Sequence, residues 1–193
     1  LDQTDLVRSS ILTETTLNFA KKIGDHDIAA LVGYEVQNNF FRGTALSGTN
    51  LPDGLPPNFS ALAPADLLTS ERRETRVRNS IFGRVNYAYA DKYLFSASLR
   101  RDGSSQFGKN KRYETFPAVS LGWNVHNEAF LENNEVLSKL KLRASRGTLG
   151  TTAFLGSYSS LSVLNPYTSI DGLSFLIPND VENPDLTWQS NTE

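Results

Sequence analysis

The sequence contains no cysteine, which excludes disulfide bonds, zinc sites with cysteine ligands and thiol catalysis. It also lacks an excess of either charge, because 19 Lys and Arg residues stand against 21 Asp and Glu residues, for a formal net charge of −2. The protein therefore has no strong net positive charge that would attract nucleic acid, and we expect no nucleic-acid partner. No apolar run resembles a signal peptide or a membrane-spanning helix.

Aromatic residues are common in this chain, at 10%, although the apolar fraction as a whole is only 39%. Such a composition suits a soluble β-protein or a membrane β-barrel, because in a barrel only every second residue of a strand meets lipid. The 193 residues begin at Leu1 rather than Met, and the last residues resemble the start of a strand. We therefore expect the chain to be a fragment of a longer protein.

The stretch from residue 80 to residue 125 has the clearest pattern in the sequence. Apolar and polar residues alternate there in three runs, which predicts three strands with unlike faces. A tight turn at 90–92 joins the first two, and a polar loop at 102–112 precedes the third, where Pro117 predicts a bulge or a bend. The predicted apolar faces comprise Ile81, Val85, Tyr87 and Tyr89; Tyr93, Phe95, Ala97 and Leu99; and Tyr113, Thr115, Pro117, Val119, Leu121, Trp123 and Val125.

The rest of the chain gives weaker patterns of the same kind. Alternation predicts strands over 5–20, 27–40 and 138–146, with a turn at Gly24 and Asp25 between the first two. Shorter signals predict strands near 157–164 and 173–177, a last strand from Leu186, a helix over 127–137, and one or two helical turns within 63–74. Glycine and proline break the pattern over 41–75 and 147–185, which we expect to be long loops.

Alternation alone does not separate a soluble β-sandwich from a membrane barrel, and three features favour the barrel. Runs of about ten residues match a tilted crossing of a hydrocarbon core, whereas globular strands average about 5–6 residues. Tyr87, Tyr89 and Tyr93 share one face around one turn, as an interfacial aromatic belt requires. The turns after Ala20, Ala90 and Val125 are short or compact and the intervening loops are mostly long, which is typical of up-and-down outer-membrane barrels.

Seven ordered motifs resemble the barrel region of the SusC/RagA family of TonB-dependent outer-membrane transporters of Bacteroidota. The resemblance is most specific over residues 76–193, whereas residues 1–75 fit it as a preceding hairpin and loop. The motifs are Arg84-Val-Asn-Tyr87, Asp91-Lys-Tyr-Leu94, Ala97-Ser-Leu-Arg-Arg-Asp-Gly-Ser-Ser105, Phe107-Gly-Lys-Asn110, Phe116-Pro-Ala-Val-Ser-Leu-Gly-Trp123, Leu140-Lys-Leu-Arg-Ala-Ser145 and Asn183-Pro-Asp-Leu-Thr-Trp188.

The resemblance implies an all-β, antiparallel, up-and-down transmembrane β-barrel, of which residues 1–193 would supply about seven of 22 strands. It also implies uptake of glycans or peptides across the outer membrane of a Gram-negative cell, with the TonB complex, a SusD-like surface lipoprotein and the lipid bilayer as partners. Residues 41–75 and 147–185 would be extracellular loops. The N-terminal plug and the TonB box that the family carries are not in this sequence.

Candidate chemical sites are few, and a plainer interpretation is favoured for each. Residues 103–110 nearly spell a phosphate-binding loop, but Asn110 follows Lys109 where Ser or Thr is needed, and a strand pattern follows in place of a helix. His26 and His126 have no third metal ligand at a suitable spacing. No serine has a positioned base and no acid pair stands out. We expect no enzyme, no catalytic residue, no metal and no cofactor.

Two groups of side chains are candidates for contact with a transported molecule, although the sequence assigns no substrate-binding residue. Arg84, Arg100, Lys139, Lys141 and Arg143 share polar strand faces, where solvation or pairing with Glu35 and Glu114 is the simpler interpretation. A second basic group, Arg72, Arg73, Arg76 and Arg78, alternates with Glu71 and Glu74 like a solvated rim. Aromatic residues predicted in loops are more readily explained by packing than by stacking on sugars: Phe40, Phe41, Phe59, Phe154, Tyr158, Tyr167 and Phe175.

Three functional hypotheses follow. The first is a wall segment of a nutrient transporter, with loops that help to enclose a binding cavity. The second is a soluble or cell-surface β-rich module that binds carbohydrate or protein through the same loops without transport. A small closed barrel of eight strands is the third, and the interrupted last strand argues against it.

Overall fold

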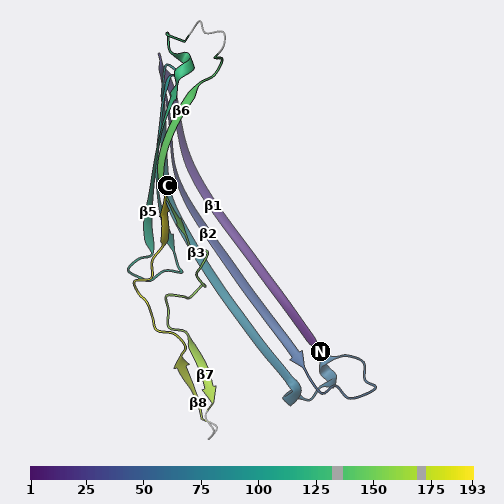
Figure 1. Cartoon of the computed structure of the whole chain (residues 1–193). Coiled ribbons are helices and arrows are strands. Elements are labelled where there is room, and N and C mark those ends of the chain that lie inside the picture. The colour runs from purple at the N-terminus through teal and green to yellow at the C-terminus, as the bar shows by residue number, and fades with distance from the viewer. Residues whose placement is uncertain (132–136, 169–172) are drawn as a thin grey trace. The chain divides into compact units, whose positions relative to one another are not determined.

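The computed structural model of the protein describes residues 1–131, 137–168 and 173–193. Seven strands form one sheet in the order β1-β2-β3-β4-β5-β6-β9, and β7 pairs with β8 in a separate hairpin (Figure 1). No helix among the described residues is long and apolar enough to cross a membrane. The strands are β1 (Asp2–Ile23), β2 (His26–Gly48), β3 (Leu67–Tyr89), β4 (Tyr93–Ser104), β5 (Tyr113–Asn124), β6 (Lys141–Thr151), β7 (Leu164–Thr168), β8 (Ser174–Pro178) and β9 (Gln189–Thr192).

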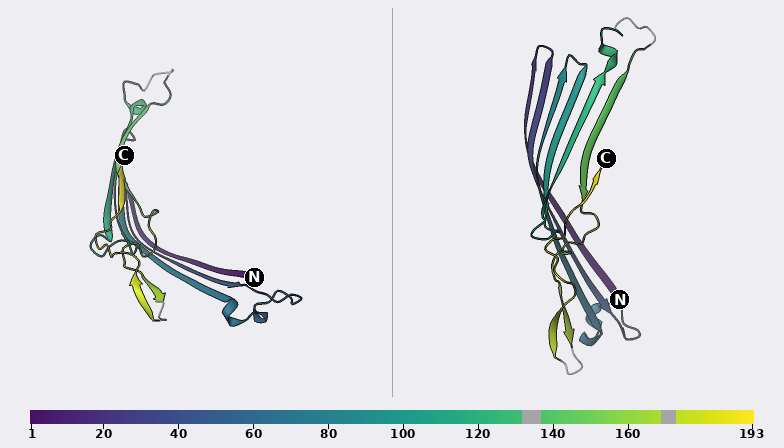
Figure 2. Two further views of the ribbon diagram at one scale, coloured as in Figure 1. Left: turned by 60° about the horizontal axis from the view of Figure 1, so that its bottom comes forward. Right: turned by 60° about the vertical axis from the view of Figure 1, so that its left-hand side comes forward.

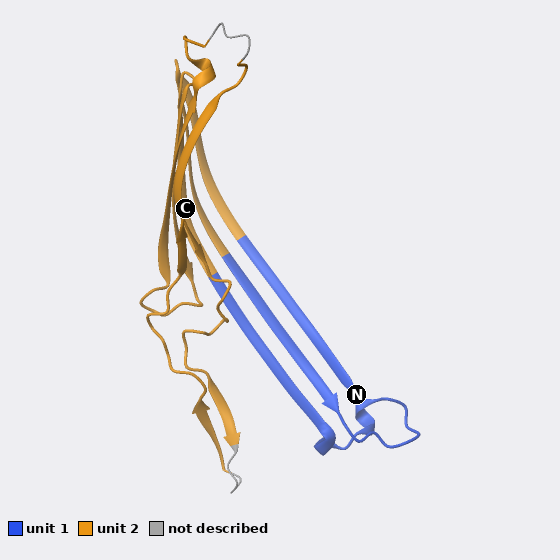
Figure 3. Cartoon of the chain, in the orientation of Figure 1, with its two compact units in different colours: residues 1–12, 37–77 blue, residues 13–36, 78–193 orange. Residues whose placement is uncertain are grey.

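The chain divides into two compact units (Figure 3). Unit 1 comprises residues 1–12 and 37–77, and unit 2 comprises residues 13–36 and 78–193. The 3₁₀ helices η1 (Phe59–Ala61) and η2 (Pro64–Asp66) belong to unit 1, and η3 (Val125–Asn127) belongs to unit 2.

In unit 2, strands that follow one another in the chain are neighbours in the sheet, and each pair from β3 to β6 is antiparallel (Figure 2). The register places Val85 beside Ala97 and Ala97 beside Val119, so the predicted apolar residues of three strands lie on one face. Successive side chains point to opposite faces of a strand, and the polar residues therefore share the other face. The strands predicted within 80–125 and their up-and-down order are confirmed.

Two short turns lie side by side at one end of unit 2, where the backbone N–H of Ala90 donates to the carbonyl of Asp25 at 2.7 Å. Ala90 and Asp91 both have positive φ, of 50° and 53°, and the N–H of Lys92 donates to the carbonyl of Tyr89. This is the type I′ geometry that matches the twist of the two strands it joins. Both turns stand where the sequence predicts them.

A bulge or a bend was predicted at Pro117, and the strand register shows no bulge there. The pairing of β4 with β5 runs without interruption from Tyr93 opposite Trp123 to Gly103 opposite Tyr113. On the other side of β5, the pairing with β6 begins only at Ala118. Pro117 therefore lies just outside the second pairing, where its missing N–H removes no bond between these strands.

In unit 1, the loop between β2 and β3 is shorter than the predicted 41–75. Strand β2 continues to Gly48 and β3 starts at Leu67, so residues 41–48 and 67–75 are strand and not loop. The helical turns predicted within 63–74 reduce to η2. At the end of β2, the Leu62 side chain lies over Gly48, and an added Cβ there would displace its terminal methyl group.

The second predicted loop, 147–185, also needs correction, because β6 extends to Thr151 and β7 and β8 form a hairpin within the loop. Strand β6 starts at Lys141 and not at residue 138, and β9 starts at Gln189 and not at Leu186. Of the helix predicted over 127–137, residues 132–136 lie outside the described residues. The described part contains Asn127, the last residue of η3, and a turn in which the Leu131 N–H donates to the Glu128 carbonyl.

Candidate functional site

The apolar face of unit 2 carries large side chains that none of the described elements covers. The exposed fraction is 55% for Ile81 and Leu99 and 59% for Leu121. Soluble monomers rarely expose so large a contiguous apolar surface, which therefore marks contact with a membrane or a partner. We define the apolar face by Ile81, Val85, Tyr87, Tyr89, Tyr93, Phe95, Ala97, Leu99, Val119, Leu121, Trp123, Leu142 and Ala144.

An aromatic cluster closes one end of the apolar face. The register aligns Tyr89, Tyr93 and Trp123 in one row across three strands, and the Tyr89 and Tyr93 rings stack with centroids 6.5 Å apart. His26 Nδ1 lies 2.7 Å from Tyr87 Oη, and its ring is 4.9 Å from that of Tyr89. The predicted Tyr87–Tyr89–Tyr93 cluster is therefore present, and Trp123 and His26 extend it.

The carboxylate of Glu128, in the turn that follows η3, accepts hydrogen bonds from side chains at this end of the apolar face. Trp123 Nε1 donates to it at 3.0 Å, Tyr93 Oη at 2.8 Å and Lys92 Nζ at 3.3 Å. These interactions hold the pKa of Glu128 below its ordinary value, with the bond from Trp123 contributing most and that from Tyr93 next, while burial acts in the opposite direction. One carboxylate thus links the turn after β5 to the start of β4.

Replacing Glu128 with glutamine should make the stability of the protein less dependent on acid. A carboxyl group whose folded pKa is lowered stabilises the fold above its unfolded pKa, and this contribution disappears as the pH falls through the folded pKa. Wild type and Glu128→Gln should therefore differ most at neutral pH and converge in acid, as followed by equilibrium unfolding over a pH series. Glu182→Gln, at an exposed carboxylate, is the matched control. A wild-type advantage that grew on acidification would contradict this.

A partly buried ion cluster occupies the polar face of unit 2. Glu35, with 12% of its side chain exposed, accepts from Arg100 at 3.3 Å and lies 3.6 Å from Arg78. Arg100 also binds Asp102 at 2.6 Å and Ser80 at 2.7 Å, and its guanidinium stacks over the Phe82 ring at 5.1 Å. Multiple hydrogen bonds to partly buried charges fix the geometry of this part of the sheet.

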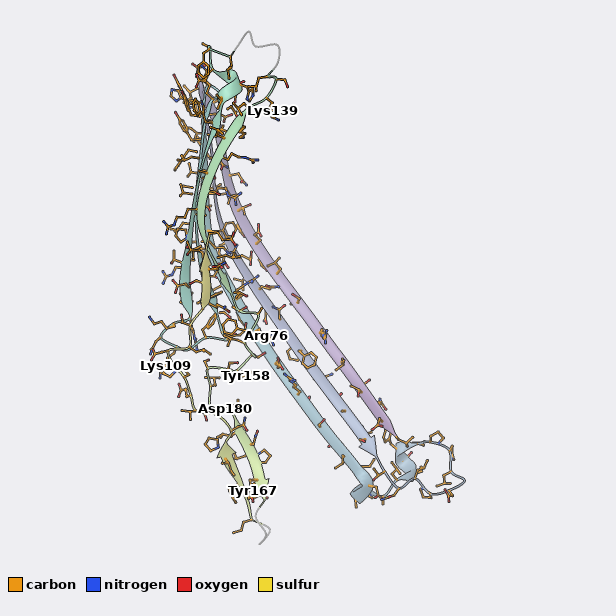
Figure 4. All side chains as sticks on the ribbon, viewed as in Figure 1. Arg76, Lys109, Lys139, Tyr158, Tyr167 and Asp180 are labelled. Carbon is orange, nitrogen blue, oxygen red and sulfur yellow. The ribbon has the colours of Figure 1, made fainter. Side chains whose placement is uncertain are left out.

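The other predicted basic residues of the polar faces do not join that cluster. Among the described residues, the side chains of Arg84, Lys139, Lys141 and Arg143 make no ion pair, and Lys139 lies just before β6 (Figure 4). Glu114, a predicted partner, instead accepts from the N–H of Thr115. Pairing with Glu35 is thus confirmed for Arg100 alone of the five.

Unit 1 has a trough of about 600 Å³, lined by Arg8, Phe41, Arg72, Glu74 and Arg76 among others. Glu74 is only 8% exposed and pairs with both Arg72 and Arg76, so the interpretation of these residues as a solvated rim is wrong for Glu74. The Arg8 guanidinium lies over the Phe41 ring at 5.5 Å and, within the described part of the chain, has no carboxylate partner. The trough therefore combines an aromatic surface with excess positive charge.

The loop after β4, whose sequence is close to a phosphate-binding motif, is a packed hairpin loop as predicted. An added Cβ at Gly108 would overlap the carbonyl group of Pro184, so the glycine permits close approach of two backbones. The N–H of Gly108 donates to the Leu186 carbonyl at 3.0 Å, and Asn110 Nδ2 donates to Asp185 at 2.9 Å. Two of the motifs that carry the family resemblance, 107–110 and 183–188, therefore bind each other.

Phe107, Phe116 and Trp188 form the buried core beneath this contact, with Leu155 and Leu186 packed against it. The Phe107 and Trp188 ring centroids are 4.6 Å apart, and Trp188 Nε1 donates to the carbonyl of Arg112 at 3.2 Å. Sequence reasoning did not identify this core, because no local pattern links residues so far apart in the chain.

The predicted loop aromatics have mixed positions. Phe40 and Phe41 belong to β2 and not to a loop, and Phe59 lies in η1 near Gly48. Tyr167 and Phe175 face each other across the β7–β8 hairpin with ring centroids 5.0 Å apart (Figure 4). Within residues 1–131, 137–168 and 173–193, no three His, Asp or Glu side chains are grouped as metal ligands would be.

Comparison with known proteins agrees with these features. Residues 2–192 match the family model described as TonB dependent receptor-like, beta-barrel. The chain is 31% identical over 185 residues to TonB-dependent receptor P39 of Formosa agariphila, covering 93% of this chain and 17% of that protein. It is 35% identical over 137 residues to TonB-dependent receptor SusC of Bacteroides thetaiotaomicron, covering 69% and 13%.

Solved structures of similar fold include that of the RagAB peptide transporter. It matches 99% of this chain and 21% of the compared chain, with a TM-score of 0.80 and 25% identity. The chain thus spans about a fifth or less of the length of the relatives it matches. Because a single family model covers residues 2–192, the chain belongs to the β-barrel family of TonB-dependent receptors, and its resemblance to SusC and RagA is confirmed.

Proposed function

We propose that this chain is part of the wall of an outer-membrane barrel that imports nutrients by an energised, TonB-dependent mechanism. The exposed apolar face with its aromatic end is the observation that carries the proposal. In a lipid bilayer this face meets acyl chains, and Tyr89, Tyr93 and Trp123 lie at the level of the headgroups on one side. The family itself consists of receptors and transporters and not of enzymes.

Strand dimensions support this setting. A tilted strand crosses the hydrocarbon core in about 9–11 residues. The segment from Ile81 to Tyr89 has that length, whereas β3 as a whole has 23 residues. The earlier residues of β3 would therefore project beyond the bilayer on the side away from the tyrosines. We assign that side to the cell exterior, together with the loops at 49–66 and 152–188.

The polar face faces the barrel interior in this proposal. The trough of unit 1 is a separate candidate for contact with a nutrient, and its arginines and Phe41 suit a polar, anion-bearing one. Both glycans and peptides include such molecules. The importer of known structure that this chain resembles is a peptide transporter, which favours peptides as the first class to test.

We further propose two protein partners, the TonB complex and a surface lipoprotein of the SusD type. This proposal relies on the named relatives, one of which is SusC itself and another of which is described as RagAB. The alternative is a cell-surface module that binds the same molecules without transporting them. The trough of unit 1 would be its binding site.

Uptake by intact cells tests the proposed function. The full-length protein should fractionate with the outer membrane, and deletion of its gene should reduce uptake of a labelled oligopeptide or oligosaccharide mixture to the level seen when an uncoupler removes the proton-motive force. Complementation with the wild-type gene should restore uptake. Outer-membrane location with binding but unchanged uptake would favour the binding module, and recovery from the soluble fraction would overturn the barrel.

A further inference from the structure

The trough of unit 1 has an unbalanced charge. All of its lining residues belong to unit 1, which Figure 3 draws in blue, and they include three arginines and one carboxylate. That carboxylate, Glu74, is 8% exposed and pairs with Arg72 and Arg76 of its own strand. Three arginines against one carboxylate leave a formal excess of two positive charges in the trough.

Arg8 is the arginine of the trough that lacks a carboxylate partner within the described part of the chain, and its guanidinium lies over the Phe41 ring at 5.5 Å from the centroid. The two carboxylates that β1 contributes to unit 1, Asp2 and Asp5, accept hydrogen bonds from Ser47 at 2.6 Å and from a nearby glutamine at 3.1 Å. A guanidinium stacked on a ring keeps its N–H groups in its own plane, where two of them match the two oxygens of a carboxylate.

Hydrogen-bond donors predominate among the side chains of the trough. Arginine side chains only donate, and the carboxylate oxygens of Glu74 already accept from two of them. The side chain of Arg72 is 75% exposed, so a ligand in the trough can reach it. Asn39 lies two residues before Phe41, on the same face of β2, and is half-buried. Its side-chain amide, which offers one acceptor and two donors, makes no hydrogen bond with any described residue.

We propose that this trough binds acidic peptides, with Arg8 holding a side-chain carboxylate of the peptide and Asn39 binding a peptide group of its main chain. The inference rests on the proposed function and deepens it, since it names the class of nutrient that the trough takes. A volume of about 600 Å³ lies within the range of ordinary ligand sites. Acidic glycans match the trough less well, because the many hydroxyl groups of a sugar need acceptors, and the acceptors of Glu74 are occupied.

Peptide binding by the purified full-length protein in detergent tests this inference. The probes are two end-blocked hexapeptides that differ only in carrying two glutamates or two glutamines at the same positions. The wild type should bind the glutamate peptide about tenfold more tightly or better, because a charge-assisted pair of hydrogen bonds is then formed. Arg8→Gln should remove this preference. Arg8→Lys keeps the charge but loses the planar pair of donors, and should retain only part of the preference.

Arg42→Gln is the matched control. Arg42 follows Phe41 directly in β2, so its exposed side chain points to the opposite face of the strand and does not line the trough. This variant loses the same charge from the same strand as its neighbour across the sheet, yet it should bind both peptides as the wild type does.

Three outcomes would overturn the inference. The first is equal affinity of the wild type for the two peptides, or binding of neither, a comparison that needs no variant. The second is an equal loss in Arg8→Gln and Arg42→Gln. The third is binding of an oligogalacturonate that depends on Arg8 while the glutamate peptide does not bind, which would assign the trough to acidic glycans. Thermal unfolding of each variant in detergent separates loss of binding from loss of fold.

The same measurements separate this inference from the proposed function. Binding of the glutamate peptide that depends on Arg8, in cells whose uptake does not depend on the protein, would refute the proposed import alone. Energised uptake by a protein that binds the glutamate and glutamine peptides equally would refute this inference alone.

Discussion

Replacing Phe107 with alanine should lower the free energy of unfolding of the full-length protein by about 3–5 kcal/mol. Phe107 has no exposed surface and contacts Trp188, which in turn meets Phe116 edge to face at 5.5 Å. Alanine would leave a cavity at the place where the loop after β4 meets residues 183–188. The loop should also become more sensitive to protease, because the packing that covers it is lost.

Equilibrium unfolding by urea in lipid vesicles, together with limited proteolysis of intact cells, measures both effects. Phe154→Ala provides the matched control, since it makes the same change at a side chain that is 52% exposed and should alter stability little. If Phe107→Ala and Phe154→Ala had equal effects, the core formed by the two motifs would not stabilise this region.

Replacing Val85 with arginine should destabilise the inserted protein by about 2–4 kcal/mol, the cost of a cation near the middle of the bilayer. Val85 lies in the row of Ala97 and Val119, four residues from Tyr89, and Arg146 continues this row on β6 at its far side from Val85. The neighbouring Asn86 points to the opposite face, where its row contains Ser96 and Ser120. Asn86→Arg should therefore cost far less, because the polar face meets water or other polar groups.

The difference between these adjacent substitutions is the informative quantity. It is measured as the folded fraction in outer membranes, from the heat-dependent gel mobility that is typical of barrels, and as unfolding free energy in vesicles. Equal losses for Val85→Arg and Asn86→Arg would contradict an assignment of lipid to one face only. A soluble, monomeric wild-type protein would contradict the bilayer altogether.

The sequence predicted the strands of unit 2 because one strong periodicity specified them. Where both faces are polar, that signal disappears, and the start of β3 was missed for this reason. The residues there follow a different period-two rule, since Arg73 pairs with Glu71 and Arg76 with Glu74, each two positions apart. Ion pairs at that spacing lie on one face of a strand, whereas a helix would place them three or four apart.

The loop core was beyond sequence reasoning for a different reason. Phe107 and Trp188 are separated by most of the second half of the chain, and no local pattern links them. The ion cluster around Glu35 was only partly foreseen, because proximity to Arg100 depends on the register of strands that are distant in sequence. The lengths of β2 and β6 were underestimated since glycine at positions 43 and 147 is compatible with a strand when a neighbouring side chain fills the space.

The contact between the two motifs has a consequence for how this protein can change over evolutionary time. Gln106 binds the carbonyl of Leu155 at 2.7 Å, and Gly108 binds that of Leu186, so both ends of the intervening segment are anchored to one hairpin loop. Closing a longer loop costs only about 0.6 kcal/mol for each doubling of its length. Ser160 still belongs to the anchored part, since it is buried and its carbonyl accepts from the N–H of Asn183. Residues 161–182, which include β7 and β8, can therefore be lengthened, shortened or exchanged with little effect on the sheet. If the proposed import function holds, a cell could acquire a new nutrient specificity by replacing that segment while it kept the sheet.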